Sequence, residues 1–281
     1  MSAPTTSTPV KATPKRCPIR TGLRADRPWG FREAKTHGIW RIIPSPALTE
    51  ILAQSGLDFQ ILDCEHGGYD YATLLPDILA CERHGCAPLV RVSGTDRVEM
   101  QRCLDLGARG LVFPQLATPE DFARAGAMMD YAPAGTRGYN PFVRAGGYGF
   151  PAPTPRPWFV PIVETLAAAR DIETIARLER IDLIYVGVCD LSALLGCPGR
   201  MDSPELAALV DRILTACHQA GKPVGMMALS ADAARQLTAR GVQTLVLWVE
   251  SHRIKDFMTA LIQRSRALRL PGELRGIAPE T

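Results

Sequence analysis

From residue 37 onward, short apolar segments alternate with longer segments of helical periodicity. The short segments are rich in β-branched side chains, which favour strands, and the longer ones repeat apolar positions at helical spacing. This pattern predicts eight strands, at residues 38–44, 59–66, 87–92, 110–116, 158–165, 182–190, 223–229 and 244–250. Eight strands that each lead into a helix predict an α/β protein with a (β/α)₈ TIM barrel.

The segments between these strands begin and end as helices do. Thr118 and Ser203 each stand before a proline, which is the usual arrangement of an N-cap and first turn. Gly56 and Gly221 stand where the preceding helices should end. A last helix is predicted over residues 251–268. The main alternative, an open doubly wound sheet, would need a glycine-rich GxGxxG turn after an early strand, and the sequence has none there.

The composition divides the chain into a tail and a folded part. Residues 1–36 contain eight Lys or Arg and two Asp or Glu in a Pro- and Thr-rich sequence without hydrophobic periodicity. A disordered basic tail is therefore predicted there, followed by a catalytic barrel over 37–270 and a flexible end over 271–281. The whole chain has a formal net charge of +3, so the part after the tail is at −3 and shows no basic stripe. We therefore expect no nucleic-acid partner.

Other features of the sequence narrow the setting. No apolar run approaches the ~20 residues of a membrane span, and no secretion signal is recognisable, so we expect neither a membrane partner nor secretion. The eight cysteines form no CxxC pair, which predicts reduced thiols and a cytoplasmic protein.

Charged side chains gather at the predicted C-terminal ends of the strands, where barrel enzymes place their active sites. They are Asp63, Glu65, His66, Arg91, Glu164 and Asp190. Glu164 and Asp190 end neighbouring strands and could bind one hard cation such as Mg²⁺ or Mn²⁺. His66 could act as general base with Asp63 orienting its ring, and Arg91 could hold a carboxylate or a developing oxyanion.

Each of these residues also has a structural interpretation. Asp190 could cap the next helix, a strand-end Glu is often only solvated, and Arg91 could pair with Asp63 or Asp105. The remaining histidines are expected on the surface, at positions 37, 84, 218 and 252. None of the five lysines ends a predicted strand, so a Schiff-base mechanism is excluded and enolate chemistry would depend on a metal.

Several separated motifs resemble those of the HpcH/HpaI aldolase/citrate lyase family of metal-dependent 2-oxo acid aldolases. They run from about residue 40 to 265 in the family's order: "FQILDCEHGGYD", "PLVRV", "CLDLGARGLVFPQLATPEDF", "APAGTRGYNPF", "PIVET" and "VGVCDLSALLG". The family fold is a (β/α)₈ barrel, which agrees with the strand count. The family's members assemble as hexamers in which dimers exchange their last helix, so a homo-oligomer of this kind is implied.

The resemblance also implies roles for single residues. Glu164 and Asp190 match the ligands of a divalent metal ion (Mg²⁺, Mn²⁺ or Co²⁺), and His66 with Asp63 matches the acid/base pair. Arg91 matches the arginine that holds the pyruvyl oxygen and stabilises the enolate. Further substrate-binding positions are implied at Glu65, at Asp105, and at the backbone amides of Gly187, Val188 and Cys189.

Two departures from the family pattern leave room for a specialised reaction, since Val188 replaces a proline and Leu194 a serine that could shape the pocket. We expect a divalent-metal-dependent lyase that cleaves or forms a C–C bond of a 4-hydroxy-2-oxo acid, through a pyruvate-type enolate and an aldehyde. A citrate-synthase-like or macrophomate-synthase-like C–C synthase is one alternative, and an inactive scaffold barrel is another. Residues 135–150, rich in aromatic and Arg side chains, are expected to cover the mouth and favour a polar aldehyde.

Overall fold

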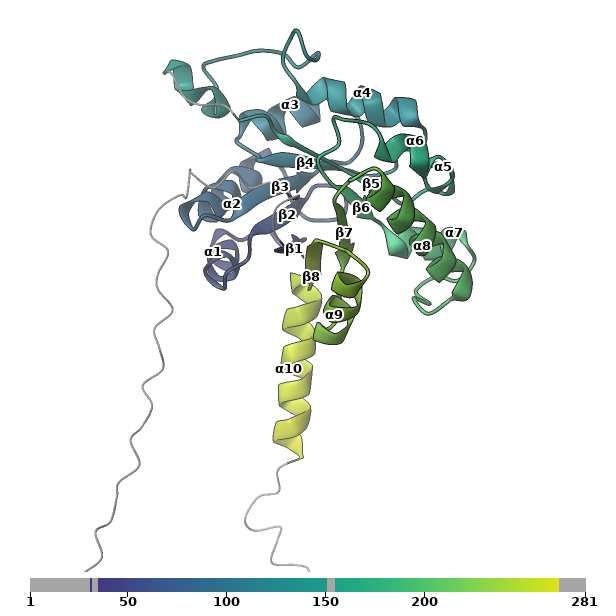
Figure 1. Ribbon diagram of the computed structural model, residues 1–281. Helices are drawn as coiled ribbons and strands as arrows, with labels where there is room; N and C mark the ends of the chain where they lie inside the picture. The colour runs from purple at the N-terminus through teal and green to yellow at the C-terminus, as the bar shows by residue number, and fades with distance from the viewer. Residues whose placement is uncertain (1–30, 32–34, 151–154, 268–281) are drawn as a thin grey trace, which may run out of the picture.

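The computed structural model describes residues 31, 35–150 and 155–267. Eight parallel strands follow one another in chain order and close into a barrel, with β8 pairing back onto β1 (Figure 1). The predicted (β/α)₈ barrel is therefore confirmed. The strands are β1 (Thr36–Arg41), β2 (Phe59–Asp63), β3 (Ala87–Arg91), β4 (Gly110–Phe113), β5 (Trp158–Val163), β6 (Ile184–Val186), β7 (Val224–Met227) and β8 (Thr244–Val249).

Helices follow the strands and surround the barrel. They are α1 (Pro46–Gln54), α2 (Tyr71–Arg83), α3 (Arg97–Asp105), α4 (Pro119–Met129), α5 (Leu166–Arg170), α6 (Ile172–Ala176), α7 (Val188–Leu194), α8 (Pro204–Gln219), α9 (Ala231–Ala239) and α10 (Glu250–Arg266), with a 3₁₀ segment η1 (Arg144–Gly149). The predicted caps are confirmed, because the Thr118 side chain accepts the Asp121 N–H and the Ser203 side chain accepts the Leu206 N–H.

Alternation along the strands separates two hydrophobic cores. Leu62 and Val90 face outward and pack with the surrounding helices, whereas Phe59, Ile61 and Leu89 face inward and fill the barrel. Because side chains in a strand alternate between faces, the same inward rows continue toward the C-terminal ends of the strands. The alternation thus decides which side chains reach the mouth of the barrel.

Most predicted strands were too long at their C-terminal ends, and for the second and the sixth this changes the site. The second ends at Asp63, whose carboxylate accepts the backbone N–H groups of Glu65 and His66 and so builds a turn. The sixth ends at Val186, and Gly187 is the N-cap of helix α7. Asp190 therefore lies in the first turn of a helix and not at a strand end.

The predicted boundary between tail and barrel was also misplaced. Phe31 is buried against the rings of Phe59 and Trp158, and Thr36 already belongs to β1. These two residues close the N-terminal end of the barrel, so they are not part of a tail. The remaining predicted tail residues up to 30, and the predicted flexible end over 271–281, lie outside the described residues.

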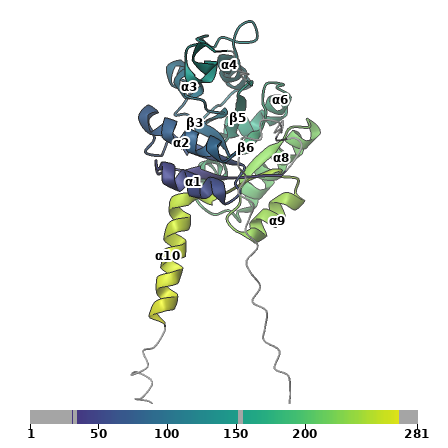
Figure 2. The same cartoon turned by 90° about the vertical axis from the view of Figure 1, so that its left-hand side faces the viewer.

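Helix α10 stands away from the barrel (Figures 1 and 2). Its only buried residue is Glu250, at its first position. Within the described part of the chain, no helix is long and apolar enough to cross a membrane. The seven cysteines of that part are free thiols.

Candidate active site

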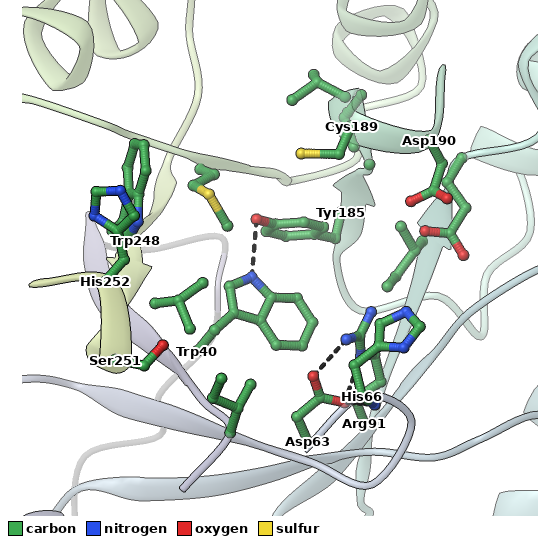
Figure 3. A pocket seen from close by; sticks show the side chains of 18 residues that line it. Trp40, Asp63, His66, Arg91, Tyr185, Cys189, Asp190, Trp248, Ser251 and His252 are labelled. Carbon is green, nitrogen blue, oxygen red and sulfur yellow. Dashed lines mark hydrogen bonds and ion pairs between the residues drawn. The ribbon is translucent and has the colours of Figure 1, made fainter. Parts of the chain in front are cut away.

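A cavity of about 530 Å³ opens at the C-terminal ends of the strands. Eight of the ten residues predicted for the site line it: Asp63, His66, Arg91, Glu164, Gly187, Val188, Cys189 and Asp190. Figure 3 shows that the charged side chains lie on one side of this cavity, while Trp248, Ser251 and His252 lie on the other. Trp40 and Tyr185 stand between the two sides. We refer to the side with the charged side chains as the charged half, and to the other side together with Trp40 and Tyr185 at its border as the neutral half.

The charged half continues the inward rows of three strands. Asp63 follows Phe59 and Ile61 at every second position of β2, and Arg91 likewise follows Leu89 on β3. Strands β2 and β3 are paired in register, so that Asp63 lies directly beside Arg91. Glu164 comes immediately after β5 and is only 3% exposed. Local alternation thus explains how residues far apart in sequence meet at one mouth.

Arg91 is held by two acids and an aromatic ring. Its Nε donates to Asp63 Oδ1 at 2.8 Å, and its Nη2 donates to the other oxygen of the same carboxylate. Its Nη1 lies 2.9 Å from Glu65 Oε2, and the guanidinium carbon lies 4.5 Å from the centroid of the Trp40 ring. A guanidinium has five N–H donors in a rigid fork. The fork is therefore fixed from one side, and its other N–H groups can serve a ligand.

The His66 ring is placed differently from the predicted arrangement. Asp63 is taken up by Arg91 and the turn amides, so it does not orient the His66 ring as expected. The carboxylate beside the ring is Glu65, with 3.9 Å between His66 Nε2 and Glu65 Oε2. The ring projects from the turn after β2, and 69% of its side chain is exposed. This imidazole can move protons between the cavity and solvent.

Glu164 has a strongly raised pKa. The pKa lies at about 7 instead of 4.5, chiefly because of burial and further because of the charges of Asp190 and Glu65, while the hydrogen bond from Gln115 lowers it. That bond joins the Gln115 N–H to Glu164 Oε1 at 2.7 Å, and Gln115 adopts a positive φ of 57°. Burial also raises the pKa of Glu65, although Arg91 opposes this.

The charged half therefore has excess negative charge. It contains four carboxylates, at Asp63, Glu65, Glu164 and Asp190, against one guanidinium, which gives a formal charge of −3 when all are ionised and His66 is neutral. A divalent cation beside Glu164 and Asp190 would relieve this repulsion, and carboxylate oxygens are the ligands that hard cations prefer. No group of three or more potential ligand side chains converges in the described residues. Glu164 and Asp190 could supply two oxygen ligands to such an ion, and its other positions would be left for substrate and water.

The loop after β6 fits closely around Glu164. A Cβ added to Gly187 would lie 2.6 Å from the Glu164 Cβ, so only glycine allows this approach. Val188 and Cys189 follow in the first turn of α7 and line the cavity. Leu194, by contrast, is 55% exposed and does not line it, so its expected effect on the pocket is not seen.

Two predicted contributions lie away from this cavity. Asp105 ends helix α3, where it accepts from Arg137 Nη2 at 2.7 Å, and it does not line the cavity. None of residues 135–150 lines it either. Arg144 instead pairs with Glu82 on α2 and donates to the carbonyl of Leu106, which fastens this segment outside the barrel.

Sequence reasoning missed the neutral half. Trp40 and Tyr185 occupy inward positions of β1 and β6, and the Trp40 Nε1 donates to the Tyr185 hydroxyl at 3.3 Å. The sequence feature that could have indicated them is a large aromatic residue at an inward-facing position near the end of each strand. His252, expected on the surface, is exposed and also lines the cavity, where its ring packs against Trp248 with 4.5 Å between centroids and 51° between the ring planes.

Trp248 reaches the cavity through an irregularity in the barrel. The pairs Gly38–Val246 and Trp40–Val249 show that β8 has one residue more than β1 at this point. Trp248 lies within this bulge and has a φ of 77°, which is uncommon for a bulky side chain and costs of order 1–3 kcal/mol. Nothing in the hydrophobic pattern of β8 indicates the extra residue.

Known proteins resemble this chain over most of its described length. The family model described as HpcH/HpaI aldolase/citrate lyase matches residues 37–254. A 5-keto-4-deoxy-D-glucarate aldolase of Salmonella paratyphi A is 34% identical over 206 residues, covering 71% of this chain and 80% of that protein.

Solved structures agree. An HpcH/HpaI aldolase/citrate lyase family protein from Burkholderia cenocepacia is 28% identical with a TM-score of 0.80, covering 84% of this chain and 97% of that one. The citrate synthase SbnG is 28% identical with a TM-score of 0.75, covering 83% and 94%. The family match over residues 37–254 contains all the residues of the charged half. The chain belongs to the HpcH/HpaI aldolase/citrate lyase family.

Proposed function

We propose that the protein is a divalent-metal-dependent carbon–carbon lyase that cleaves or forms a 4-hydroxy-2-oxo acid, with a 2-oxo acid such as pyruvate and an aldehyde as its partners. The observation that carries this proposal is the excess of carboxylates around Arg91 at the mouth of the barrel. Four acids and one base are electrostatically unfavourable in a structural cluster but suit a site that receives a cation and an oxyanion together.

The proposed site assigns a separate task to each group. Glu164 and Asp190 would hold Mg²⁺, Mn²⁺ or Co²⁺, which when bound supplies Lewis-acid stabilisation of the 2-oxo acid's enolate. The backbone of the Gly187–Cys189 turn would position the substrate carboxylate. The free N–H groups of Arg91 would donate to the oxygen that gains charge, and Asp63 and Glu65 keep the guanidinium in place for this.

In the cleavage direction, His66 would accept the proton of the C4 hydroxyl. The C3–C4 bond then breaks, its electron pair forms the enolate of the 2-oxo acid, and the C4 carbon leaves as an aldehyde. Return of a proton to C3 completes the 2-oxo acid. Condensation follows the same steps in reverse. The exposed position of His66 allows it to exchange its proton with water between the two halves of the cycle.

Oxaloacetate decarboxylation in the presence and absence of metal tests this proposal, because it needs only the enolate-stabilising half of the site. We expect chelator to abolish it and added Mg²⁺ or Mn²⁺ to restore it. Glu164→Gln and Asp190→Asn should each lose turnover and metal binding in calorimetry, whereas Glu179→Gln, an identical change at an exposed surface position, should keep both. If both site variants bind metal as well as the parent, the metal site is elsewhere and the mechanism is wrong.

A specialised C–C synthase of the same family is the second candidate. The 28% identity to the citrate synthase SbnG supports it, as does Val188 in the turn beside the cavity. A synthase would run the same enolate chemistry toward condensation. Product analysis separates the two candidates when oxaloacetate supplies the enolate and an aldehyde competes with a second 2-oxo acid as acceptor. An aldolase should favour the aldehyde.

We also propose a homo-oligomer in which α10 packs against a second copy of the chain. The helix exposes an apolar stripe made of Ile254, Phe257, Met258, Leu261 and Ile262. These positions are three or four apart and so lie on one helical face. An apolar face on a helix that stands clear of its own barrel (Figure 2) is what an exchanged helix would present, as in the hexamers that the family resemblance implies.

A further inference from the structure

The neutral half of the cavity has a composition unlike that of the charged half. Its walls are the rings of Trp40, Tyr185, Trp248 and His252, together with apolar side chains such as Met227. Figure 3 places Trp248 and His252 across the cavity from Asp190 and His66, with Trp40 and Tyr185 between them. A substrate that leaves its 2-oxo acid end in the charged half must extend its other end between these rings.

Among the described residues of one chain, no Arg or Lys of this half points at a substrate. Arg91 is the one Arg or Lys among the described residues that line the cavity, and it is bound to Asp63 and Glu65. Arg253 lies near but is turned elsewhere, because its Nη2 donates to the Leu229 carbonyl and its guanidinium carbon lies 5.5 Å from the Trp248 ring centroid. The His252 ring has an acid as its neighbour, with 3.8 Å from Nδ1 to Asp256 Oδ2.

Two features show that the neutral half is built for a ligand. Trp248 lies within the bulge in β8 and lines the cavity, and bulges of this kind re-aim side chains next to active sites. The Tyr185 hydroxyl accepts from Trp40, and among the described residues none accepts its own proton. That O–H stands between the two halves (Figure 3), where it can donate to a neutral oxygen of a substrate.

We propose that the neutral half is the aldehyde subsite and that it selects uncharged aldehydes with an apolar body over aldehydes that carry a second acid group. This inference rests on the proposed function and specifies its substrate class. A second carboxylate extending between the rings would lose its water without gaining a cationic partner, which strongly disfavours it. An apolar chain of the same shape would be stabilised by burial. This proposal replaces the earlier expectation of a polar aldehyde, which rested on residues 135–150, because that segment does not line the cavity.

A matched pair of aldehydes tests the proposal in the full-length protein with pyruvate and Mn²⁺. In 4-methylpentanal an isopropyl group stands where 4-oxobutanoate has its carboxylate, so the two differ in charge at nearly equal shape. We expect kcat/KM to be at least ~10-fold higher for 4-methylpentanal, as a site without a partner for the charge should discriminate by at least this factor. A preference for 4-oxobutanoate would overturn the proposal and leave the proposed function intact.

Substitutions in the neutral half test which residues bind the aldehyde. Trp248→Gly suits the positive φ at this position, so it should fold, and it should lower the ratio of 4-methylpentanal condensation to oxaloacetate decarboxylation at least ~10-fold. His252→Ala should lower the same ratio, whereas Val98→Ala on the exposed face of α3 should leave it unchanged. An unchanged ratio in both Trp248→Gly and His252→Ala would show that the aldehyde binds elsewhere.

A binding measurement separates this proposal from the proposed function. Saturation-transfer NMR with the unreactive alcohol 4-methylpentan-1-ol should show contact with the parent protein and a loss in Trp248→Gly, with 4-hydroxybutanoate as the charged control. If the alcohol binds in this way and no lyase activity is found, the proposed reaction is wrong and the subsite stands. If the charged control binds as well as the alcohol, the subsite assignment is wrong whatever the activity.

Discussion

Replacing Glu164 by Gln should make the metal-free protein more stable at alkaline pH, although it removes turnover. Glu164 is 3% exposed and accepts a backbone N–H from Gln115, which an amide oxygen at the same place can also accept. What the substitution removes is a buried negative charge that faces Asp190 and Glu65. The variant should therefore lose turnover and gain stability. This is expected where carboxylates that repel one another in the ligand-free protein are needed for function.

The magnitude follows from the pKa of Glu164. Folding raises this pKa from 4.5 to about 7, so the folded protein holds the proton more tightly than the unfolded chain. The stabilising protonation is complete below pH 4.5 and is lost as the pH rises through about 7. At about 1.4 kcal/mol per pKa unit, the free energy of unfolding should fall by about 3 kcal/mol across this window. Gln cannot ionise, so the variant should not show this fall.

Urea unfolding of the parent, Glu164→Gln and Glu179→Gln between pH 5 and pH 8, with chelator present, measures this difference. The parent and the exposed control Glu179→Gln should weaken together toward pH 8, and Glu164→Gln should overtake both. Saturating Mn²⁺ should remove the weakness of the parent and of Glu179→Gln only. Parallel pH profiles for all three proteins would refute the assignment of a buried, repelled carboxylate at position 164.

Three other substitutions test the remaining parts of the site and the assembly. His66→Ala should keep the fold and lose at least ~100-fold in turnover, with His84→Ala outside the cavity as a control, and near-normal turnover would move the base elsewhere. Arg91→Lys should also lose turnover, because an ammonium group cannot reproduce the two-oxygen contact with Asp63, and a rise in KM alone would contradict this role. Phe257→Glu on α10 should reduce the size of the oligomer in light scattering, and an unchanged size would show that α10 is not the contact.

The barrel could be predicted from the sequence because its information is local. Each strand is a short apolar run, most helices have a side-chain N-cap, and strand order follows from right-handed parallel connections. The ends of strands were less predictable. Strand β2 ends in the turn that Asp63 builds and β6 ends where Gly187 caps α7, and these depend on hydrogen bonds that the apolar pattern does not report.

The charged half of the site could be predicted for a similar reason. Charged residues that directly follow apolar runs must lie at one end of a parallel barrel, so Arg91 and Glu164 could be brought together without coordinates. Which of these side chains pair with one another could not be predicted from the sequence. The choice between His66 and Arg91 as the partner of Asp63 depends on the register of β2 with β3, which puts Asp63 beside Arg91 and leaves the His66 ring to Glu65.

The neutral half could not be predicted from the local pattern of apolar and charged residues. One extra residue in β8 turns Trp248 into the cavity and brings His252 with it, and the strand around this residue reads as an ordinary apolar run. A resemblance between sequences does not reveal such a residue, because it compares residue positions and does not report where a side chain points. The charged half would carry the proposed metal-dependent chemistry, whereas the aldehyde would meet walls that include the residue in the bulge of β8. Substrate choice in this protein should therefore change with substitutions at Trp248 and His252 while the demand for metal stays with Glu164 and Asp190.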